Sequence, residues 1–266
     1  RHDLGPLRIA EIEAIGDRQR GRADGGDIAP GLGHCLLAAL EGIGLAIARR
    51  HVGGEGKRLR RVALDADHAG IAAGAASKTG KLGYVYAFPI PQTLANINAF
   101  TLGAQSVNPA AETIAISTGS WCDPGLQAEA AKSLLDQGVD VITQHQDCTK
   151  TIIEATEAAG AFTVGYHADA SELAPKGWLT GSEWSWDKLY VDITTTVRDG
   201  KFKESDYNGD FRVGLQTGDN PFVQSEFGPS VSADTKTKIE AARTAFVDGG
   251  SPFKGPVANQ DGEEVY

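Results

Sequence analysis

Between residues 111 and 169 the chain alternates short apolar runs with longer segments that have apolar residues at helical spacing. The apolar runs are rich in β-branched and aromatic residues and are too short for helices, so they predict buried strands. These runs are Thr113–Ser117, Asp140–Thr143 and Phe162–Tyr166. Of the two segments between them, one begins at Asp123-Pro124 and the other at about Thr149, and each stops at a glycine, as helices do.

The same alternation begins earlier in the chain. We expect a helix of small residues over Ala69–Ser77, a strand over Leu82–Ala87, and a helix from Thr93 to about Ser106 with Leu94 and Ile97 on its inner side. Strands that alternate with helices predict an α/β fold with a parallel sheet. In such sheets, ligands bind beyond the carboxyl ends of the strands.

Chemically versatile side chains follow the predicted strands. Phe88 follows the earliest of the four, and the later three are followed by Ser120-Trp121-Cys122-Asp123, Gln144-His145-Gln146-Asp147 and His167-Ala168-Asp169. The carboxyl ends of parallel strands meet at one edge of a sheet. We therefore expect aromatic, imidazole and carboxylate groups to converge there.

Composition narrows the possible partners. The 266 residues are long enough for one large α/β domain or two lobes, and the net charge of −10 argues against nucleic acid or an anionic membrane surface as partner. Cys35, Cys122 and Cys148 lack metal-site spacing and form no disulfide framework, although one bridge is open to them. The absence of methionine and the start at Arg1 indicate a processed product or a fragment.

Residues 1–66 differ from the rest of the chain. They are rich in arginine, glycine and alanine and show no strand-like apolar run, and their best element is a helix over Cys35–Arg50. We interpret this segment as poorly ordered or as a mis-joined translation, because a different pattern starts abruptly near Asp67.

Several runs resemble one known family. They are Lys81–Pro91 (KLGYVYAFPIP), Asn96–Pro109 (NINAFTLGAQSVNP), Asp136–His145 (DQGVDVITQH), Leu173–Lys176 (LAPK) and Phe253–Gly262. In this order they resemble the basic membrane protein (BMP) family over about residues 69–262. Members are substrate-binding proteins of ABC transporters and are related to purine-nucleoside-binding lipoproteins.

The resemblance implies a type I periplasmic-binding-protein-like fold, with two α/β lobes built on parallel sheets and an incomplete first lobe. Residues 1–66 would be an unrecognised segment and 67–79 the end of the first lobe. Residues 80–182 would form the second lobe. Residues 183–266 would hold hinge crossings and C-terminal elements that return to the first lobe, including helices at Tyr190–Arg198 and 234–248.

The implied function is capture of a small polar solute, a purine base or nucleoside, for an ABC permease. Such a protein works in the periplasm or on the outer face of the plasma membrane, and is not an enzyme. The resemblance implies no cofactor, no metal and no nucleic acid. Membrane contact would need a lipid anchor that this chain does not contain.

The resemblance also implies roles for individual residues. The predicted ligand-binding residues are Phe88, Trp121, His145, Asp147, Asp169, Trp184, Trp186 and Gly209. Phe88, Trp121 and Trp186 would stack on a planar ligand, and His145, Asp147 and Asp169 would orient it. Trp184 and Trp186 would share one face of a strand, and Gly209 would lie in a glycine-bearing strand near the site.

Structural roles compete with several of these assignments. Asp169 could cap the turn that follows it, Trp121 could be a buried structural residue, and Asp123 is explained by a helix start alone. Trp178 is expected to lie at the surface or between lobes.

Two other functions remain open from the sequence. The pairs His145/Asp147 and His167/Asp169 could form the centre of a metal-dependent hydrolase, since imidazole and carboxylate groups are usable metal ligands. Alternatively, a chain with an incomplete first lobe could be a non-functional fragment, because a cleft needs two walls.

Overall fold

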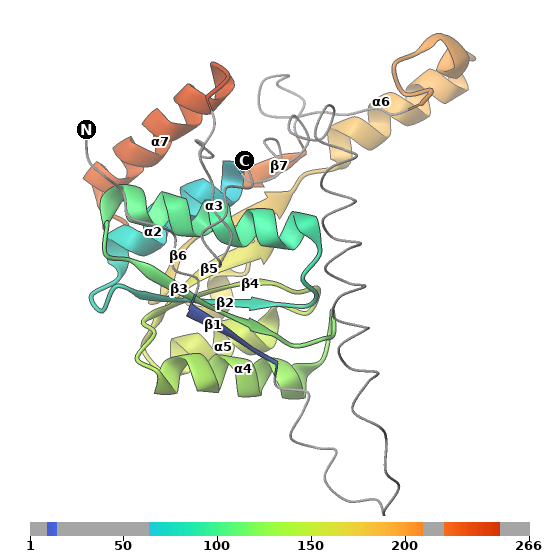
Figure 1. Cartoon of the computed structure of the whole chain (residues 1–266). Helices are drawn as coiled ribbons and strands as arrows, with labels where there is room; N and C mark the ends of the chain where they lie inside the picture. Colours follow the sequence, from blue (N-terminus) through green and yellow to red (C-terminus); the bar gives the residue numbers. More distant parts are fainter. Residues whose placement is uncertain (1–9, 15–63, 210–220, 251–266) are drawn as a thin grey trace, which may run out of the picture.

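A seven-stranded sheet forms the centre of the computed structural model, which describes residues 10–14, 64–209 and 221–250 (Figure 1). The strand order is β1-β3-β2-β4-β5-β6-β7, and all neighbouring pairs are parallel except β6 with β7. The strands are β1 (Ala10–Ala14), β2 (Lys81–Tyr86), β3 (Glu112–Ser117), β4 (Val141–His145), β5 (Phe162–His167), β6 (Trp178–Trp184) and β7 (Phe222–Gln224). The predicted parallel α/β sheet is confirmed.

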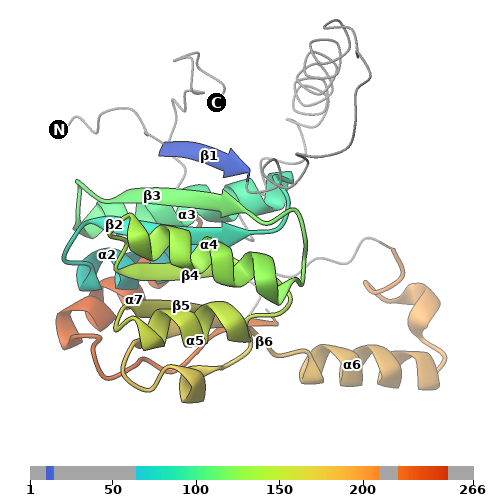
Figure 2. The same cartoon turned by 90° about the horizontal axis from the view of Figure 1, so that it is seen from below.

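Helices cover both faces of the sheet (Figures 1 and 2). On one face lie α2 (Leu64–Ala76), α3 (Pro91–Val107) and α7 (Ala233–Val247), and on the other α4 (Pro124–Asp136) and α5 (Lys150–Ala158). The helix α6 (Asp187–Arg198) extends away from these layers and buries none of its residues. Two short 3₁₀ helices are η2 (Ser171–Leu173) and η3 (Phe202–Glu204). No helix of the described residues combines the length and apolarity needed to cross a membrane.

Alternating side chains of the central strand feed two separate cores. Leu82, Tyr84 and Tyr86 of β2 are buried against α2 and α3, whereas Val85 packs with residues of α4 and α5. This two-residue period is the geometry of a strand that is covered on both faces. Continuous apolar runs therefore signalled the strands correctly.

Local signals in the sequence fix where helices begin and end. The Asp123 carboxylate accepts a hydrogen bond from the Leu126 amide at 3.0 Å, and Pro124 occupies the first turn of α4. The structural role expected of Asp123 is thus confirmed. Helix α3 begins at Pro91 and ends before Asn108, whose successor Pro109 disfavours a helical backbone at Asn108.

Glycines explain why α2 is built from small residues. A Cβ atom added at Gly70 would collide with the Phe100 carbonyl oxygen of α3, and one at Gly74 would lie 2.5 Å from the Ala104 carbonyl oxygen. The backbones of α2 and α3 therefore approach more closely than any larger residue at these positions would allow.

Three expectations about individual positions are wrong. Residues 1–66 contain a strand after all, because Ala10–Ala14 pairs in parallel with β3. Leu94 is 39% exposed rather than inward-facing. Trp178 is only 1% exposed, which rules out the surface position, while the alternative position between lobes stays a prediction. The Trp178 indole fills space that Gly165 of the neighbouring strand leaves open, and it donates to the Glu226 carbonyl oxygen at 3.2 Å.

The expected lobe boundaries remain a prediction. Helix α2, expected at the end of a first lobe, packs on α3, and α7 packs on α2, so both lie against the unit formed by residues 80–182 (Figure 1). Among the later elements that the structure describes, α6 points away from that unit, and η3 follows at its outer end (Figure 2). The helix expected over Cys35–Arg50 and the family-like run Phe253–Gly262 lie outside the described residues.

Candidate ligand-binding site

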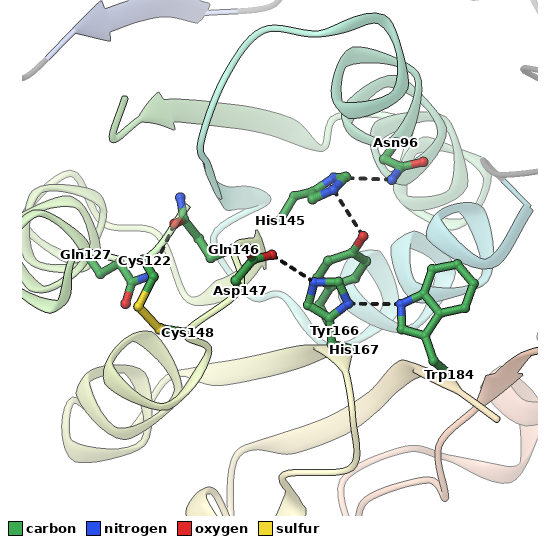
Figure 3. Close-up of polar contacts among 10 residues, drawn as sticks. All are labelled: Asn96, Cys122, Gln127, His145, Gln146, Asp147, Cys148, Tyr166, His167 and Trp184. Carbon is green, nitrogen blue, oxygen red and sulfur yellow. Dashed lines mark hydrogen bonds and ion pairs between the residues drawn. A yellow bond between two sulfur atoms is a disulfide. The ribbon is translucent and has the colours of Figure 1, made fainter. Parts of the chain in front are cut away.

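The carboxyl ends of the central strands meet at one edge, as predicted. Tyr86 at the end of β2 pairs with Ser117 of β3 on one side and with His145 of β4 on the other, while His167 of β5 pairs with Glu183 of β6. The residues that follow these ends form a rim, part of which is drawn in Figure 3. We call this edge the rim, and its principal side chains are Phe88, Trp121, His145, Asp147, Tyr166, His167 and Trp184.

Two aromatic rings form the first side of the rim. Phe88 and Trp121 contact each other edge to face, with ring centres 5.4 Å apart and planes at 62°, and Trp121 lies 6.0 Å from the His145 ring. A planar ligand clamped between two rings needs about 7 Å, because each contact spans about 3.5 Å. In this arrangement no ligand fits between Phe88 and Trp121, so each ring can offer only an outer face.

His145 is the buried polar centre of the rim (Figure 3). It is 5% exposed, its Nδ1 lies 3.4 Å from Asn96 Nδ2, and its Nε2 lies 3.0 Å from the Tyr166 hydroxyl. Burial lowers the pKa of His145 to about 4, with a further decrease from His167 that is opposed by Asp147. The imidazole is therefore neutral at pH 7, with one nitrogen that donates and one that accepts.

Sequence reasoning missed Asn96 and Tyr166 as partners of His145. Asn96 is a buried amide on the inner face of α3, and its Oδ1 has no hydrogen-bond partner among the described residues. Burial raises the pKa of Tyr166, and the nearby Asp147 raises it further, so the phenol remains protonated. A polar residue inside an otherwise buried helix face and a tyrosine near a strand end were the available signals.

His167 has an unusual backbone. Its φ of 75° lies in the left-handed region, which residues other than glycine seldom adopt, and such strain is held only by surrounding contacts. Its Nε2 lies 3.4 Å from an Asp147 carboxylate oxygen, and its Nδ1 accepts a hydrogen bond from the Trp184 indole at 2.9 Å. Because Nδ1 accepts, the neutral ring carries its proton on Nε2. Burial lowers the pKa of His167, which Asp147 partly offsets.

Aromatic rings continue from the rim onto α6. Trp184 stacks with Trp186 at 4.8 Å, and Trp186 stacks with Tyr190 at 5.8 Å. The strand β6 ends at Trp184 and Trp186 immediately precedes α6, so the two indoles do not share a strand face as predicted. They meet because the helix turns the second indole back onto the first.

Two predicted site residues have local roles or lie elsewhere. Asp169 is exposed, and its carboxylate accepts a hydrogen bond from the Ser171 amide at 2.8 Å, which is the competing structural role. Gly209 lies in a bend after η3, beyond α6, and not in a strand as predicted. The prediction failed because the glycine was read as a strand residue, whereas its φ of 137° suits a turn. Gly214 lies outside the described residues.

A disulfide joins two loops of the rim. Cys122, which follows Trp121, bonds to Cys148, which follows Asp147 (Figure 3). In addition, the Asp147 amide donates to the Trp121 carbonyl oxygen at 2.8 Å. The one bridge that the sequence left open is therefore formed. Cys35 lies outside the described residues.

A small cavity lies beside the rim among the residues that the structure describes. This cavity of about 20 Å³ between α3 and the sheet, lined partly by Asn96, Gln144 and Tyr166, has room for about one water molecule. Over the described ranges, no three His, Cys, Asp or Glu side chains are grouped so that they could hold a metal ion. The contacts described here therefore suit recognition of an organic solute by rings and neutral hydrogen-bonding groups.

A parallel α/β unit with such side chains at the carboxyl ends of its strands has the arrangement in which open α/β sheets bind small ligands. The chain belongs to the Bmp family, because residues 68–247 match the family model described as "ABC transporter substrate-binding protein PnrA-like". The resemblance seen in the sequence is confirmed. Members of this family are solute-binding proteins, so the hydrolase alternative gains no support.

Individual relatives agree with this assignment. A purine-binding protein of Brucella abortus is 37% identical over 196 residues, which cover 73% of this chain and 54% of the relative. A putative ABC transporter glucose-binding protein of Haloferax volcanii is 33% identical over 193 residues, which cover 70% of this chain and 48% of the relative. The chain thus spans about half the length of these relatives.

Solved structures support the fold. A transcriptional activator of the comK gene from Bacillus halodurans superposes with a TM-score of 0.61 at 25% identity, over 73% of this chain and 65% of that one. An ABC transporter solute-binding protein from Conexibacter woesei gives a TM-score of 0.58 at 22% identity, with the same coverage of both chains. The predicted fold class is therefore confirmed.

Proposed function

We propose that this protein is the extracytoplasmic solute-binding component of an ABC transporter and that its rim binds a purine base or nucleoside. The observation that carries the proposal is the cluster of aromatic rings beside two imidazoles held neutral and one exposed carboxylate. A purine offers a flat face for stacking and edge groups that both donate and accept hydrogen bonds. The purine-binding relative supports the same solute class.

The proposed division of labour follows from the contacts. Phe88 is 37% exposed and Trp121 is half-buried beside it, so both have ring surface available to a ligand. Base–aromatic stacking contributes about 1–3 kcal/mol per base, against about −8 kcal/mol for micromolar binding. Stacking would therefore supply a substantial part of the affinity. Trp186, which stacks between Trp184 and Tyr190, would contribute through its ring edge.

Polar groups would set the orientation of the ligand. Asp147 is exposed, and one of its carboxylate oxygens lies near His167, which leaves acceptor capacity for a ribose diol or a base amino group. His145 would hold the Tyr166 hydroxyl in position rather than contact the ligand itself, since both side chains are buried and share a hydrogen bond. Asp169 would add a further acceptor, because the Ser171 amide occupies only one of its two carboxylate oxygens.

A second wall and a permease complete the proposal. Ligand sites usually enclose 70–90% of a small ligand, which one open rim cannot do. We infer that a second lobe closes over the rim and that lobe closure is the state the permease recognises. The protein would bind its solute in the periplasm or on the outer face of the plasma membrane.

Tryptophan fluorescence tests the proposal directly. The full chain is titrated with adenine, adenosine, guanosine and inosine, and in parallel with glucose because of the second relative. We expect saturable quenching by at least one purine at micromolar concentration. A response to glucose alone, or to none of the five in a protein folded by circular dichroism, would overturn the purine assignment.

A pair of variants then tests the site. Calorimetric titration of Trp121→Ala should show an affinity loss of about 5- to 150-fold, which corresponds to the stacking contribution of about 1–3 kcal/mol. Phe202→Ala serves as the aromatic control, because Phe202 lies in η3 beyond α6 and away from the rim. Equal losses in both variants would remove Trp121 from the site.

A further inference from the structure

The disulfide of the rim connects the two loops on which the proposed site depends. Cys122 and Cys148 are 26 positions apart in sequence, and their Cα atoms lie 5.0 Å apart. Trp121 precedes the first cysteine and Asp147 precedes the second. The bridge therefore joins the aromatic side of the rim to its carboxylate side (Figure 3).

Strand order makes this connection important. Although β3 and β4 are consecutive along this part of the chain, β2 lies between them in the sheet. At about 4.8 Å per strand spacing, the ends of β3 and β4 are about 10 Å apart, and no ladder hydrogen bond joins them. The disulfide and the hydrogen bond from the Asp147 amide to the Trp121 carbonyl oxygen both span the end of β2. They fix the loop after β3 relative to the loop after β4.

A buried network holds the bases of the two loops but not their tips. Gln127 donates to Gln146 at 3.1 Å, and Gln146 donates to the Thr118 hydroxyl at 2.9 Å. Gln127 and Gln146 are fully buried. Beyond this network, the Thr118 hydroxyl donates to the Ser120 carbonyl oxygen at 2.7 Å and the Cys122 amide donates to the Ser120 hydroxyl at 3.3 Å, but both contacts stay within one loop. The disulfide and the hydrogen bond from the Asp147 amide to the Trp121 carbonyl oxygen join this part of the loop to the loop that follows β4.

We propose that the Cys122–Cys148 disulfide is a positioning element of the binding site, which keeps Trp121 in place relative to Asp147. The proposal rests on the proposed function, because it assumes that Trp121 contacts the ligand. With the bridge intact, Trp121 stays against Phe88 and the ligand meets a preformed wall. Without it, the ligand must order the loop as it binds, and that ordering lowers the affinity.

Reduction and mutation open the bridge independently. Cys122 is exposed, so a water-soluble phosphine can reach the disulfide. The phosphine becomes its oxide with an oxygen atom from water, and the two sulfurs take up two electrons and two protons to become thiols. The double variant Cys122→Ser/Cys148→Ser removes the bridge without reductant, and urea unfolding verifies that both forms are folded under the titration conditions.

Calorimetric titration with the four purines measures the effect. In the wild-type background we expect the Kd to rise about tenfold when the bridge is opened, equivalent to about 1.4 kcal/mol. In a Trp121→Ala background we expect opening the bridge to change the Kd less than about twofold. A general loss of stability would weaken binding in both backgrounds alike. An unchanged wild-type Kd, or an equal loss in both backgrounds, overturns the proposal.

Hydrogen exchange separates failure of this proposal from failure of the proposed function. The Asp147 amide is protected by the Trp121 carbonyl oxygen, so its exchange should accelerate when the bridge is opened, with no ligand present. If no purine binds the oxidised protein, the proposed function fails, and acceleration would still establish that the bridge positions the loop. Unchanged exchange at Asp147 overturns the positioning role whatever the ligand.

Discussion

Acidification should destabilise the wild-type protein more than a His145→Gln variant. The His145 imidazole is 5% exposed, and its burial lowers its pKa from 6.5 to about 4 in the folded protein. Between these two pKa values the unfolded chain binds a proton that the folded protein does not. Stability therefore rises with pH in this window and is lost as the pH falls from 6.5 towards 4. Glutamine is neutral throughout and has no such dependence.

The pKa difference sets the size of the effect. At about 1.4 kcal/mol per pKa unit, a drop from 6.5 to about 4 is worth about 3 kcal/mol of unfolding free energy. The full amount is lost only near pH 4, and roughly half should be lost near pH 5.3. Asp67 and His68, whose pKa values are about 7 and about 4, also titrate in this range. They are present in both proteins, so the comparison removes most of their contribution.

Urea unfolding at a series of pH values from about 7.5 to 4.5 measures this difference. As the pH decreases, we expect the free energy of unfolding of the wild-type protein to approach that of the variant or to fall below it, with equal m-values for both. A stability difference that stays constant within about 0.5 kcal/mol across the series would refute the conclusion that burial keeps His145 neutral. A steeper loss in the variant would reverse the sign and refute it equally.

Three further substitutions and one control substitution test the packing and the polar contacts by urea unfolding. Gly70→Ala should lower the free energy of unfolding by more than about 2 kcal/mol, because its Cβ would collide with an α3 carbonyl oxygen. The control Gly125→Ala, whose Cβ would meet a side-chain carboxylate at 3.3 Å, should lower it by less than about 1 kcal/mol. Similar costs would contradict the close approach of the helices. Asp123→Ala should cost about 1 kcal/mol through loss of the α4 N-cap, and no change would contradict that role. Tyr166→Phe should cost about 1–3 kcal/mol because it leaves a buried nitrogen of His145 unpaired, and a neutral result would mean that water replaces the hydroxyl.

The sequence predicted the elements of the fold well because their signals are local. Apolar runs identified β2 to β5, and Asp123-Pro124 marked the start of α4 within the chain itself. The strand β1 was missed because Ala10–Ala14 is short and contains two glutamates, so it lacks a strong apolar run. Only its pairing with β3 reveals it.

Burial depended on partners that are distant in sequence. Trp178 was expected at the surface or between lobes, and it is enclosed because Gly165 of β5 has no side chain to occupy the same space. The register of β5 against β6 brings these two residues together. Neither the glycine nor the tryptophan alone predicts the contact, since each residue type occurs in many other structural settings.

The candidate site shows the same division between local and distant information. Because residues that follow parallel strands must gather at one edge, the sequence alone placed Phe88, Trp121, His145 and Asp147 on the rim. It could not predict which of them touch, since contact depends on strand order. The consecutive strands β3 and β4 are separated by β2, so a link between their loops has to cross another strand end. The Cys122–Cys148 disulfide spans the end of β2 and links the two loops. The spacing of the two cysteines in the sequence could not predict this link, because it depends on the strand order.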